Sequence, residues 1–379
     1  MAQTFDVCIR GAGVVGRTLA LLLARERLRV ALVTRANPTP HPAADVRAYA
    51  LNAASRALLE SVRSWPDAAH ATAVRQMQVH GDQDGMVTFD ADRQDAEALA
   101  WIVDVPALQA RLADAVRFQP QVEVVDAPVP AALTVVCEGR ASRTREEFGG
   151  EFDVTPYGQN AIATRLQCEV GHGQVARQWF LTSGVLAFLP LDGAQGNSVA
   201  VVWSVSQDEA ADLMALDADA FTQRLQEASG NALGALQLQG ERASWPLQQA
   251  QARSWCGPMA TQPAKGPQRT WALAGDAAHT VHPLAGQGLN LGLADAQALA
   301  RVLRERDYWR SMSDLRLLRH YERERKAALA PMGLAMDGLQ QLFMRREGAL
   351  QSLRNWGMKG FDLSGPLKQW VARRAMGVR

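Results

Sequence analysis

Short hydrophobic runs bounded by glycine or polar residues mark the start of the chain. Residues 6–9 and 29–33 are continuous hydrophobic runs, which predict buried parallel strands. Between them a glycine loop leads into residues 14–27, where hydrophobic positions recur at helical spacing. The order strand, loop, helix, strand predicts the unit with which a dinucleotide-binding fold begins.

The next hundred residues have a weaker pattern. Residues 46–62 and 106–116 have helical spacing, and residues 87–94 are polar and predict a loop. Residues 133–136 form a third hydrophobic run, directly before Cys137-Glu138-Gly139, and predict another buried strand.

In the middle of the chain the pattern becomes that of strands. Residues 184–190 and 198–204 are rich in strand-forming residues and are separated by a turn signal at Asp192-Gly193. They predict antiparallel strands in a second sheet. Residues 207–230 return to helical spacing, with Ser206 as the predicted N-cap.

The last third returns to the order strand, loop, helix. Residues 270–274 predict a strand that ends in Gly275-Asp276, and residues 289–306 predict the helix after the loop. Residues 321–325 open a long helical region that runs towards Gly357.

These patterns together predict an α/β fold: a Rossmann-like nucleotide-binding domain, a second antiparallel-sheet domain and C-terminal helices. We assign residues 1–155 and 260–330 to the nucleotide-binding domain, which is therefore discontinuous in sequence. Residues 156–259 form the predicted substrate domain, and residues 331–379 form the C-terminal helical region.

Composition and charge narrow the class of protein. The 379 residues carry a formal net charge of +1, which gives no reason to expect a nucleic-acid partner. Four widely spaced cysteines without a CxxC pair argue against a zinc site or a disulfide framework, and they fit a reducing, cytoplasmic setting. The N-terminal residues lack the pattern of a signal peptide, and the hydrophobic run at residues 19–24 is too short to span a bilayer.

The first chemical motif is Gly11-Ala12-Gly13-Val14-Val15-Gly16. In such a motif the first glycine permits a tight turn, the second lets the backbone approach a pyrophosphate, and the third lets the helix pack closely on the strand. The N-terminus of the following helix then offers free N–H groups and a positive dipole end to the phosphates. The pattern alone is a weak signal, but here it follows a strand and opens a helix, as nucleotide binding requires.

One expected part of this unit is missing. An acidic residue normally ends the second strand and binds the ribose hydroxyls, but Thr34-Arg35 occupies that place. Arg35 raises the alternative that an NADP 2′-phosphate binds here directly. We rank this alternative below FAD because of the second motif.

The second motif runs from Gly275-Asp276 through His279, His282 and Pro283 to Gly286-Gln287-Gly288-Leu289-Asn290 and Gly292. A strand delivers the aspartate to its carboxyl edge, where ligands of open α/β sheets bind. The loop then leads to a second helix N-terminus, whose positive dipole end favours a ligand that gains negative charge. The glycines let the backbone lie against a flat ring system.

This second segment, GDAAH followed by HPLAGQGLNLGL, resembles the flavin-binding motif of FAD-dependent aromatic hydroxylases, and especially of the ubiquinone-biosynthesis hydroxylases. Residues 45–52 resemble a stretch of that family that contains an arginine. Residues 157–163 and 179–190 resemble its substrate-domain strands, and the C-terminal helices are also similar. The resemblance implies that FAD is bound by Gly11, Ala12, Gly13, Val14, Gly16, Thr34, Arg35, Arg47, Asp276, Pro283, Gly286, Gln287, Gly288, Leu289 and Asn290.

The resemblance also implies a reaction. The expected activity is hydroxylation of an aromatic ring of a polyprenylated quinone precursor, with FAD as cofactor, O2 as oxidant and NAD(P)H as a transient co-substrate. The expected partners are a hydrophobic aromatic small molecule and other quinone-biosynthesis proteins. No general base can be named from the sequence. The chain departs from the family pattern at Thr34, at Glu138 in place of an aspartate, and in a shortened segment between residues 112 and 133.

Several alternatives remain open at this point. The chain is either an active quinone-precursor hydroxylase, a FAD monooxygenase for another hydrophobic aromatic substrate, or a degenerate member that binds partners without catalysis. His279 and His282 are more easily explained by hydrogen bonds that shape the loop than by a metal site, because no third ligand is near in sequence. Residues 367–376 are basic with interleaved hydrophobic residues, which fits either peripheral contact with an anionic inner-membrane surface or a helix end packed on the protein.

Overall fold

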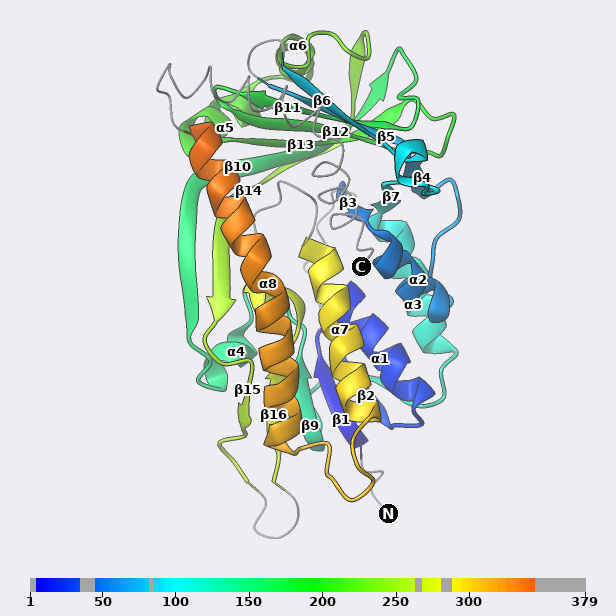
Figure 1. Cartoon of the computed structure of the whole chain (residues 1–379), viewed down its shortest axis with the longest axis vertical. Helices are drawn as coiled ribbons and strands as arrows, with labels where there is room; N and C mark the ends of the chain where they lie inside the picture. The colour runs from blue at the N-terminus through cyan, green and yellow to red at the C-terminus, as the bar shows by residue number, and fades with distance from the viewer. Residues whose placement is uncertain (1–4, 35–44, 82–84, 263–267, 281–287, 345–379) are drawn as a thin grey trace.

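The computed structural model describes residues 5–34, 45–81, 85–262, 268–280 and 288–344, with side chains described up to residue 330. The described residues form a parallel-sheet layer with helices on it, a large second sheet at the opposite end, and a small third sheet between them (Figure 1). This arrangement confirms the predicted α/β class with a second, mainly antiparallel sheet.

The first sheet has six strands and carries the predicted nucleotide-binding unit. Its strands pair in parallel except at the edge, where β15 runs antiparallel to β16. Val7, Cys8 and Ile9 of the central strand are fully buried, which explains the continuous hydrophobic run in the sequence. In order across the sheet, the strands are β15 (Cys256–Pro258), β16 (Thr270–Leu273), β9 (Ala131–Val136), β1 (Phe5–Arg10), β2 (Val30–Val33) and β8 (Val122–Val125).

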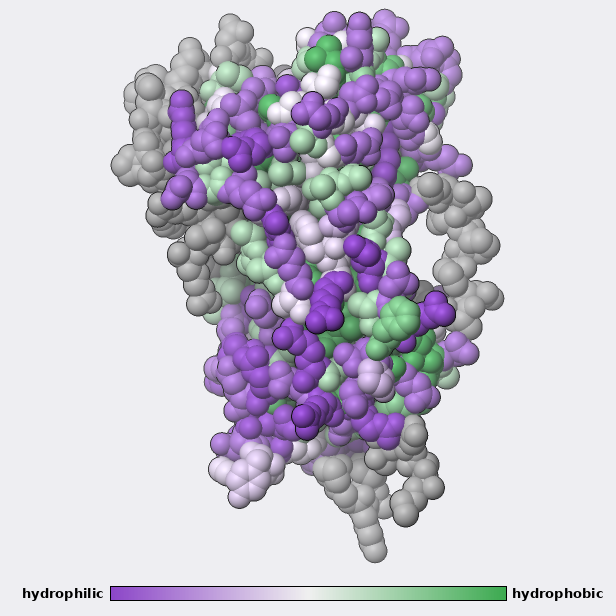
Figure 2. Space-filling view, turned by 90° about the vertical axis from the view of Figure 1, so that its right-hand side faces the viewer, coloured by the Kyte–Doolittle hydropathy of each residue, from purple (hydrophilic) through white to green (hydrophobic). Residues whose placement is uncertain are grey.

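Helices cover this sheet. α1 (Val14–Arg25) and α7 (Gly288–Arg304) lie side by side on one face, and α8 (Leu315–Met344) runs next to α7 along the length of the molecule (Figure 1). α3 (Val105–Arg117) packs against α1 and turns Leu108, Leu112 and Val116 inward. Because these hydrophobic residues point to the core, the face of the molecule with α2 (Ala53–Ser61) and α3 is mostly hydrophilic (Figure 2).

The large sheet has eight strands. It is antiparallel except where β11 pairs in parallel with β5, and β10 and β14 extend far enough to reach from the large sheet towards the parallel sheet (Figure 1). α5 (Gln207–Ala215) and α6 (Ala218–Ala228) pack on it, with Phe221 and Trp203 in one buried cluster. The order of the strands is β17 (His279–Thr280), β14 (Leu236–Ala252), β10 (Phe152–Cys168), β13 (Ser198–Ser206), β12 (Gly184–Pro190), β11 (Val175–Leu181), β5 (Gln76–His80) and β6 (Met86–Asp90).

The third sheet is small and antiparallel. It consists of β3 (Ala48–Leu51), β7 (Ala100–Asp104) and β4 (Ala71–Val74), and it lies beside α2 and α3 between the two larger sheets (Figure 1). Short elements complete the described fold: η1 (Asp92–Gln94), α4 (Arg143–Glu147) and η2 (Gly275–Ala277).

Most predicted elements are confirmed, and two predictions were wrong. The helix predicted at residues 46–62 is strand β3 followed by helix α2, because Asn52 accepts a hydrogen bond from the backbone N–H of Ser55 and caps the helix there. The loop predicted at residues 87–94 is mostly strand β6, which pairs with β5, followed by η1.

Three further boundaries differ from the prediction. The helix predicted at residues 207–230 is two helices. Leu216 is the C-cap of α5, and the next residue, Asp217, is the N-cap of α6. α8 begins at Leu315, ahead of the predicted start at residue 321, and residues 345–357 lie outside the described part. The predicted N-cap Ser206 is confirmed, since its side chain accepts from the N–H of Glu209.

The proposed division into domains stays a prediction. Strands β5 and β6 belong to the large sheet, although residues 1–155 were assigned to the nucleotide-binding domain. β15 at residues 256–258 pairs within the parallel sheet, close to the second predicted boundary.

Candidate functional site

The glycine loop after β1 combines two glycines that the fold requires with one that it does not. Gly11 has a φ of +113°, and a Cβ on it would lie 2.4 Å from the carbonyl oxygen of Cys137. A Cβ on Gly16 would lie 1.9 Å from the carbonyl oxygen of Gly11. A Cβ on Gly13 would meet no atom within 4 Å. Protein packing thus explains Gly11 and Gly16, while Gly13 borders open space at the N-terminus of α1.

The second loop meets the first. Gly275 has a φ of +65°, and a Cβ on it would lie 3.3 Å from a methyl group of Val15 in α1. A Cβ on Gly292 in α7 would lie 2.8 Å from the same methyl group and 3.3 Å from Cα of Gly275. The first turn of α1, the loop after β16 and the start of α7 therefore converge. Gly288, the first residue of α7, also borders open space, with no atom within 4 Å of an added Cβ.

Asp276 lies at this junction, at the carboxyl edge of the parallel sheet. Its side chain is exposed to solvent, although neighbouring protein partly desolvates it. This desolvation raises the pKa of its carboxyl group, and the charge of Asp295 adds to that rise. His279, Arg140 and Arg47 act in the opposite direction, so these three side chains lie near Asp276. The predicted residues Arg47 and Asp276, although 229 positions apart in sequence, face the same region.

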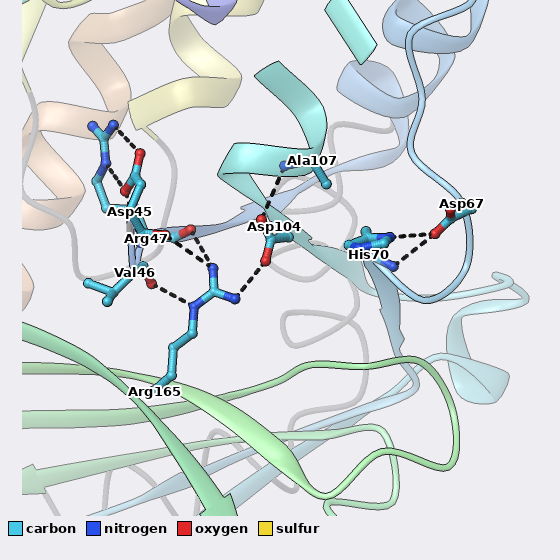
Figure 3. Close-up of polar contacts among 8 residues, drawn as sticks. All are labelled: Asp45, Val46, Arg47, Asp67, His70, Asp104, Ala107 and Arg165. Carbon is cyan, nitrogen blue, oxygen red and sulfur yellow. Dashed lines mark hydrogen bonds and ion pairs between the residues drawn. The ribbon is translucent and has the colours of Figure 1, made fainter. Parts of the chain in front are cut away.

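Arg47 forms a bidentate ion pair with Asp45 in this structure (Figure 3). Arg47 Nε donates to Asp45 Oδ1 at 2.8 Å, and Nη2 donates to Asp45 Oδ2 at 2.7 Å. The hydrogen bond with Asp45 is the main reason that the pKa of Arg47 is raised, and Tyr49 contributes in the same direction. The Arg47 side chain is 46 % exposed, so it remains accessible to a ligand.

Asn290 joins the start of α7 to the small sheet. Its side-chain oxygen accepts from the N–H of Asn52 at 3.0 Å and from the hydroxyl of Ser55 at 2.7 Å, and its amide donates to the carbonyl of Ala50 at 2.8 Å. Its predicted role in binding FAD stays a prediction. Its side chain, 5 % exposed, has a structural role that the sequence did not reveal.

A buried charge cluster lies behind the second loop. Asp295 of α7 is fully buried and accepts from the N–H of Gly275 at 2.9 Å and from Nε of Arg325 at 2.6 Å, and its Oδ2 lies 2.7 Å from Nε2 of His279. Burial opposes ionisation of Asp295, but His279 and Arg325 outweigh it, so its pKa is lowered. Trp255 stacks on His279. The interpretation of His279 as a residue that shapes the loop is therefore confirmed, while His282 lies outside the described residues.

The segment after β9 is held by polar contacts. Glu138 accepts from Arg10 Nε at 3.2 Å and from the hydroxyl of Ser142 at 2.9 Å. Burial raises the pKa of Glu138, but contacts of its carboxylate with Thr144 and Ser142 and the charge of Arg10 lower it by more, so the net shift is downward. Arg145, buried over the ring of Phe152, donates to the carbonyl of Ala277 at 3.2 Å and thereby supports the second loop.

The remaining predicted residues divide into two groups. Ala12, Val14 and Leu289 pack on the core around the two loops, and Thr34 follows β2 at the same edge of the sheet, where its N–H donates to the carbonyl of Val125 at 3.0 Å. Arg35, Pro283, Gly286 and Gln287 lie outside the described residues. Among the described residues, no group of histidine, cysteine or acidic side chains could hold a metal ion.

Some neighbours of the site could not be recognised in the sequence. Burial raises the pKa of Tyr49, and the charges of Arg47 and Asp276 act on that pKa in opposite directions, so Tyr49 lies near both. Arg140 contributes a second positive charge near Asp276. The signal that could have found Tyr49 is its place two residues after Arg47, within residues 45–52.

A family model and two nearly full-length relatives match this chain. The family described as FAD binding domain matches residues 113–332. The 3-demethoxyubiquinol 3-hydroxylase of Escherichia coli is 30 % identical over an alignment that covers 99 % of each chain. The ubiquinone hydroxylase UbiL of Rhodospirillum rubrum is 29 % identical, covering 98 % of this chain and 90 % of its own length.

The fold is also that of a solved monooxygenase. The crystal structure of p-nitrophenol 4-monooxygenase PnpA from Pseudomonas putida DLL-E4 superposes with a TM-score of 0.74 at 18 % identity, and the match covers all of both chains. At that identity the likeness concerns the fold alone. Together with the full-length similarity to the hydroxylases, it leads to one conclusion. The chain belongs to the ubiquinone-biosynthesis hydroxylase family and is a FAD-dependent monooxygenase.

Proposed function

We propose that this protein hydroxylates an aromatic ring of a polyprenylated quinone precursor, using FAD, NAD(P)H and O2. The observation that carries the proposal is the relative from Escherichia coli, whose name states this class of reaction and which aligns over 99 % of both chains. The alternative substrates are other hydrophobic aromatic compounds, and deletion-strain analysis and NAD(P)H consumption distinguish them.

The described residues fit FAD. Gly13 and Gly288 each leave open space at a helix N-terminus, and a Cβ at either position would enter that space. The two helices converge at Val15, so both positive dipole ends face one region. Arg47 adds a positive charge there and Asp276 adds a hydrogen-bonding carboxyl group. This combination suits a molecule with phosphates, hydroxyl groups and a ring that becomes negatively charged.

We propose specific roles for these residues. Gly11 and Gly16 shape the loop, Gly13 admits the pyrophosphate, and Arg47 pairs with its charge. Asp276 binds hydroxyl groups of the cofactor, and the N–H groups at the start of α7 support the reduced ring. When bound, FAD supplies the redox chemistry, which transfers reducing equivalents from NAD(P)H to oxygen and the oxygen atom to the substrate ring.

We also propose that the protein contacts a membrane surface. The support is the hydrophobic class of substrate and the basic, partly hydrophobic residues 367–376, which lie outside the described part. Of the helices in the described residues, none is long and hydrophobic enough to cross a membrane. Co-sedimentation with anionic vesicles tests the proposal: binding should be lost when residues 367–379 are removed and should weaken with salt.

Three measurements test the function. The purified protein should absorb at about 370 and 450 nm, where oxidised flavins absorb. A deletion strain should accumulate an under-hydroxylated quinone precursor, and the purified protein should consume NAD(P)H faster when that precursor is added. If the deletion strain makes its quinone normally, the proposed substrate is wrong. If the precursor never stimulates NAD(P)H consumption while FAD is bound, the protein is a non-catalytic member of the family.

A further inference from the structure

One arginine of the large sheet reaches the segment that carries Arg47. Arg165 lies on β10, and its guanidinium points away from the sheet towards residues 45–47, which we call the arginine segment (Figure 3). Nε donates to the carbonyl of Val46 at 3.3 Å, and Nη2 lies 3.4 Å from the carbonyls of both Asp45 and Arg47. Nη1 donates to Asp104 Oδ2 at 2.6 Å. One side chain thus contacts three consecutive carbonyls and a carboxylate.

The carboxylate partner is itself tied to a helix. Asp104 ends β7 and caps α3, because its Oδ1 accepts from the N–H of Ala107 at 3.2 Å. Both charged side chains are shielded, with 24 % of Arg165 and 15 % of Asp104 exposed. An ion pair of this kind is stronger than one at the surface, and its charge keeps the guanidinium in a single orientation.

The arginine segment is held mainly by side chains from other elements. Residues 45–47 precede β3 and belong to neither a helix nor a strand. Within the described residues, the other hydrogen bonds of its backbone are from the N–H of Val105 to the carbonyl of Arg47 at 3.3 Å and from the N–H of Arg47 to Asp45 Oδ1 at 3.1 Å. Arg165 therefore makes more hydrogen bonds to this backbone than any other side chain in the described part of the chain.

We propose that Arg165 is a positioning residue of the cofactor site. It holds the backbone of the arginine segment so that the Arg47 side chain stays near Asp276, and it does so from the large sheet. The side chain that we expect to meet FAD is thereby coupled to the sheet that we expect to bind the substrate. The inference rests on the proposed role of Arg47, and it does not depend on which ring is hydroxylated.

The chemistry requires an arginine at this position. A guanidinium is planar and presents five N–H donors in a fixed arrangement, so it can reach the carboxylate and the carbonyls together. A lysine would keep the charge for Asp104 but offers one compact ammonium, which cannot hold all four acceptors. Arg165→Lys and Arg165→Met therefore separate the ion pair from the contacts with the carbonyls.

The test is a double-mutant cycle on FAD affinity in the full-length protein. FAD is titrated into the flavin-free forms of wild type, Arg47→Met, Arg165→Met and the double variant. If Arg165 acts through Arg47, Arg165→Met weakens FAD binding about tenfold alone but less than about twofold in the Arg47→Met background. Arg165→Lys should lie close to Arg165→Met, because it loses the carbonyl contacts. If Arg165→Met does not fold, the cycle is run with Arg165→Lys.

Arg253→Met is the matched control. Arg253 also forms ion pairs, with Glu151 and Asp153 at the other end of the β10–β14 pair, but it is exposed and far from the arginine segment in the fold. It should leave FAD affinity unchanged. Additive effects of Arg47→Met and Arg165→Met, or an Arg165→Met affinity equal to wild type, would overturn the proposal. If Arg47→Met and Arg165→Met have the expected non-additive effect on FAD affinity but no quinone precursor is hydroxylated, the proposed role of Arg165 stands and the proposed substrate is rejected.

Discussion

Two glycines of one loop should respond differently to the same substitution. Gly13 and Gly16 are three residues apart at the start of α1, and each can be replaced by alanine. A Cβ on Gly16 would lie 1.9 Å from a backbone oxygen, whereas a Cβ on Gly13 would meet no atom within 4 Å. Gly16→Ala therefore tests packing inside the protein, and Gly13→Ala tests the space reserved for a ligand.

The magnitudes follow from the local geometry. The Gly16 clash is with backbone, so the strand and helix must move apart, at a cost of about 3 kcal/mol or more in the free energy of unfolding. Gly13 has a φ of −76°, which alanine adopts without strain, and losing a glycine stabilises by about 0.4–1 kcal/mol through the unfolded chain. Gly13 is also the N-cap of α1, where alanine is worse than glycine by a similar amount. The two effects offset each other, so Gly13→Ala should change the stability of the flavin-free protein little.

FAD binding, unlike stability, should be sensitive to the substitution at Gly13. The added methyl group would occupy the space in which we place the pyrophosphate, and overlap of this kind costs about 1–3 kcal/mol. That corresponds to a dissociation constant for FAD about 5- to 150-fold higher. Gly288→Ala at the start of α7, where an added Cβ is equally free of contacts, should behave in the same way.

The assay has two parts. Urea denaturation of the flavin-free variants gives the free energy of unfolding, and titration with FAD, followed by flavin fluorescence, gives the affinity. The reasoning fails if Gly13→Ala binds FAD within about twofold of wild type, since the open space would then not be the cofactor site. It also fails if Gly13→Ala destabilises the flavin-free protein as much as Gly16→Ala does.

Three further predictions concern charge and burial. Desolvation by neighbouring protein raises the pKa of Asp276, so the flavin-free protein loses stability as pH rises from about 4, the ordinary carboxyl value, through the raised pKa. Asp276→Asn should therefore raise the melting temperature at neutral pH but not at pH 4 or below, while FAD binding weakens. Arg325→Met leaves the buried carboxylate of Asp295 without its cationic partner and should lower the free energy of unfolding in urea by about 3–5 kcal/mol, whereas Arg253→Met should have little effect. Burial raises the pKa of Cys8, that of Cys168 to about 11 and that of Cys256 to about 12, so iodoacetamide near pH 8 should label these thiols, as seen by mass spectrometry, only after unfolding.

The parallel sheet could be predicted because its signals are local. Strands buried on both faces appear as continuous hydrophobic runs, and β1, β2, β9 and β16 each have one. The prediction of a helix at residues 46–62 was wrong because the structure there depends on a contact that is distant in sequence. Residues 48–51 become a strand through pairing with β7, a segment about fifty positions away, and helical spacing within the segment gives no sign of that partner.

The candidate site also combines features that short motifs reveal with contacts between residues that are distant in sequence. Gly11, Gly16 and Gly275 belong to motifs that are short in sequence, so the motifs could be recognised, although Gly11 packs against Cys137 and Gly275 against Val15. The residues that place these loops relative to one another are distant: Asn290 contacts Asn52, Asp295 pairs with Arg325, and Arg165 pairs with Asp104.

Each of these distant partners is an ordinary polar residue whose type suits many roles, so a single sequence offers no reason to pair it with another. The missing acidic residue at Thr34 illustrates the consequence. Taken alone it suggests a weakened cofactor site, but positive charge from Arg47 and Arg140 and two converging helix ends gather at the same region from other parts of the chain. Cofactor affinity is the sum of such contributions. A loss at one motif position therefore predicts little until the fold shows which charges accompany it, and the FAD titrations described above measure that sum directly.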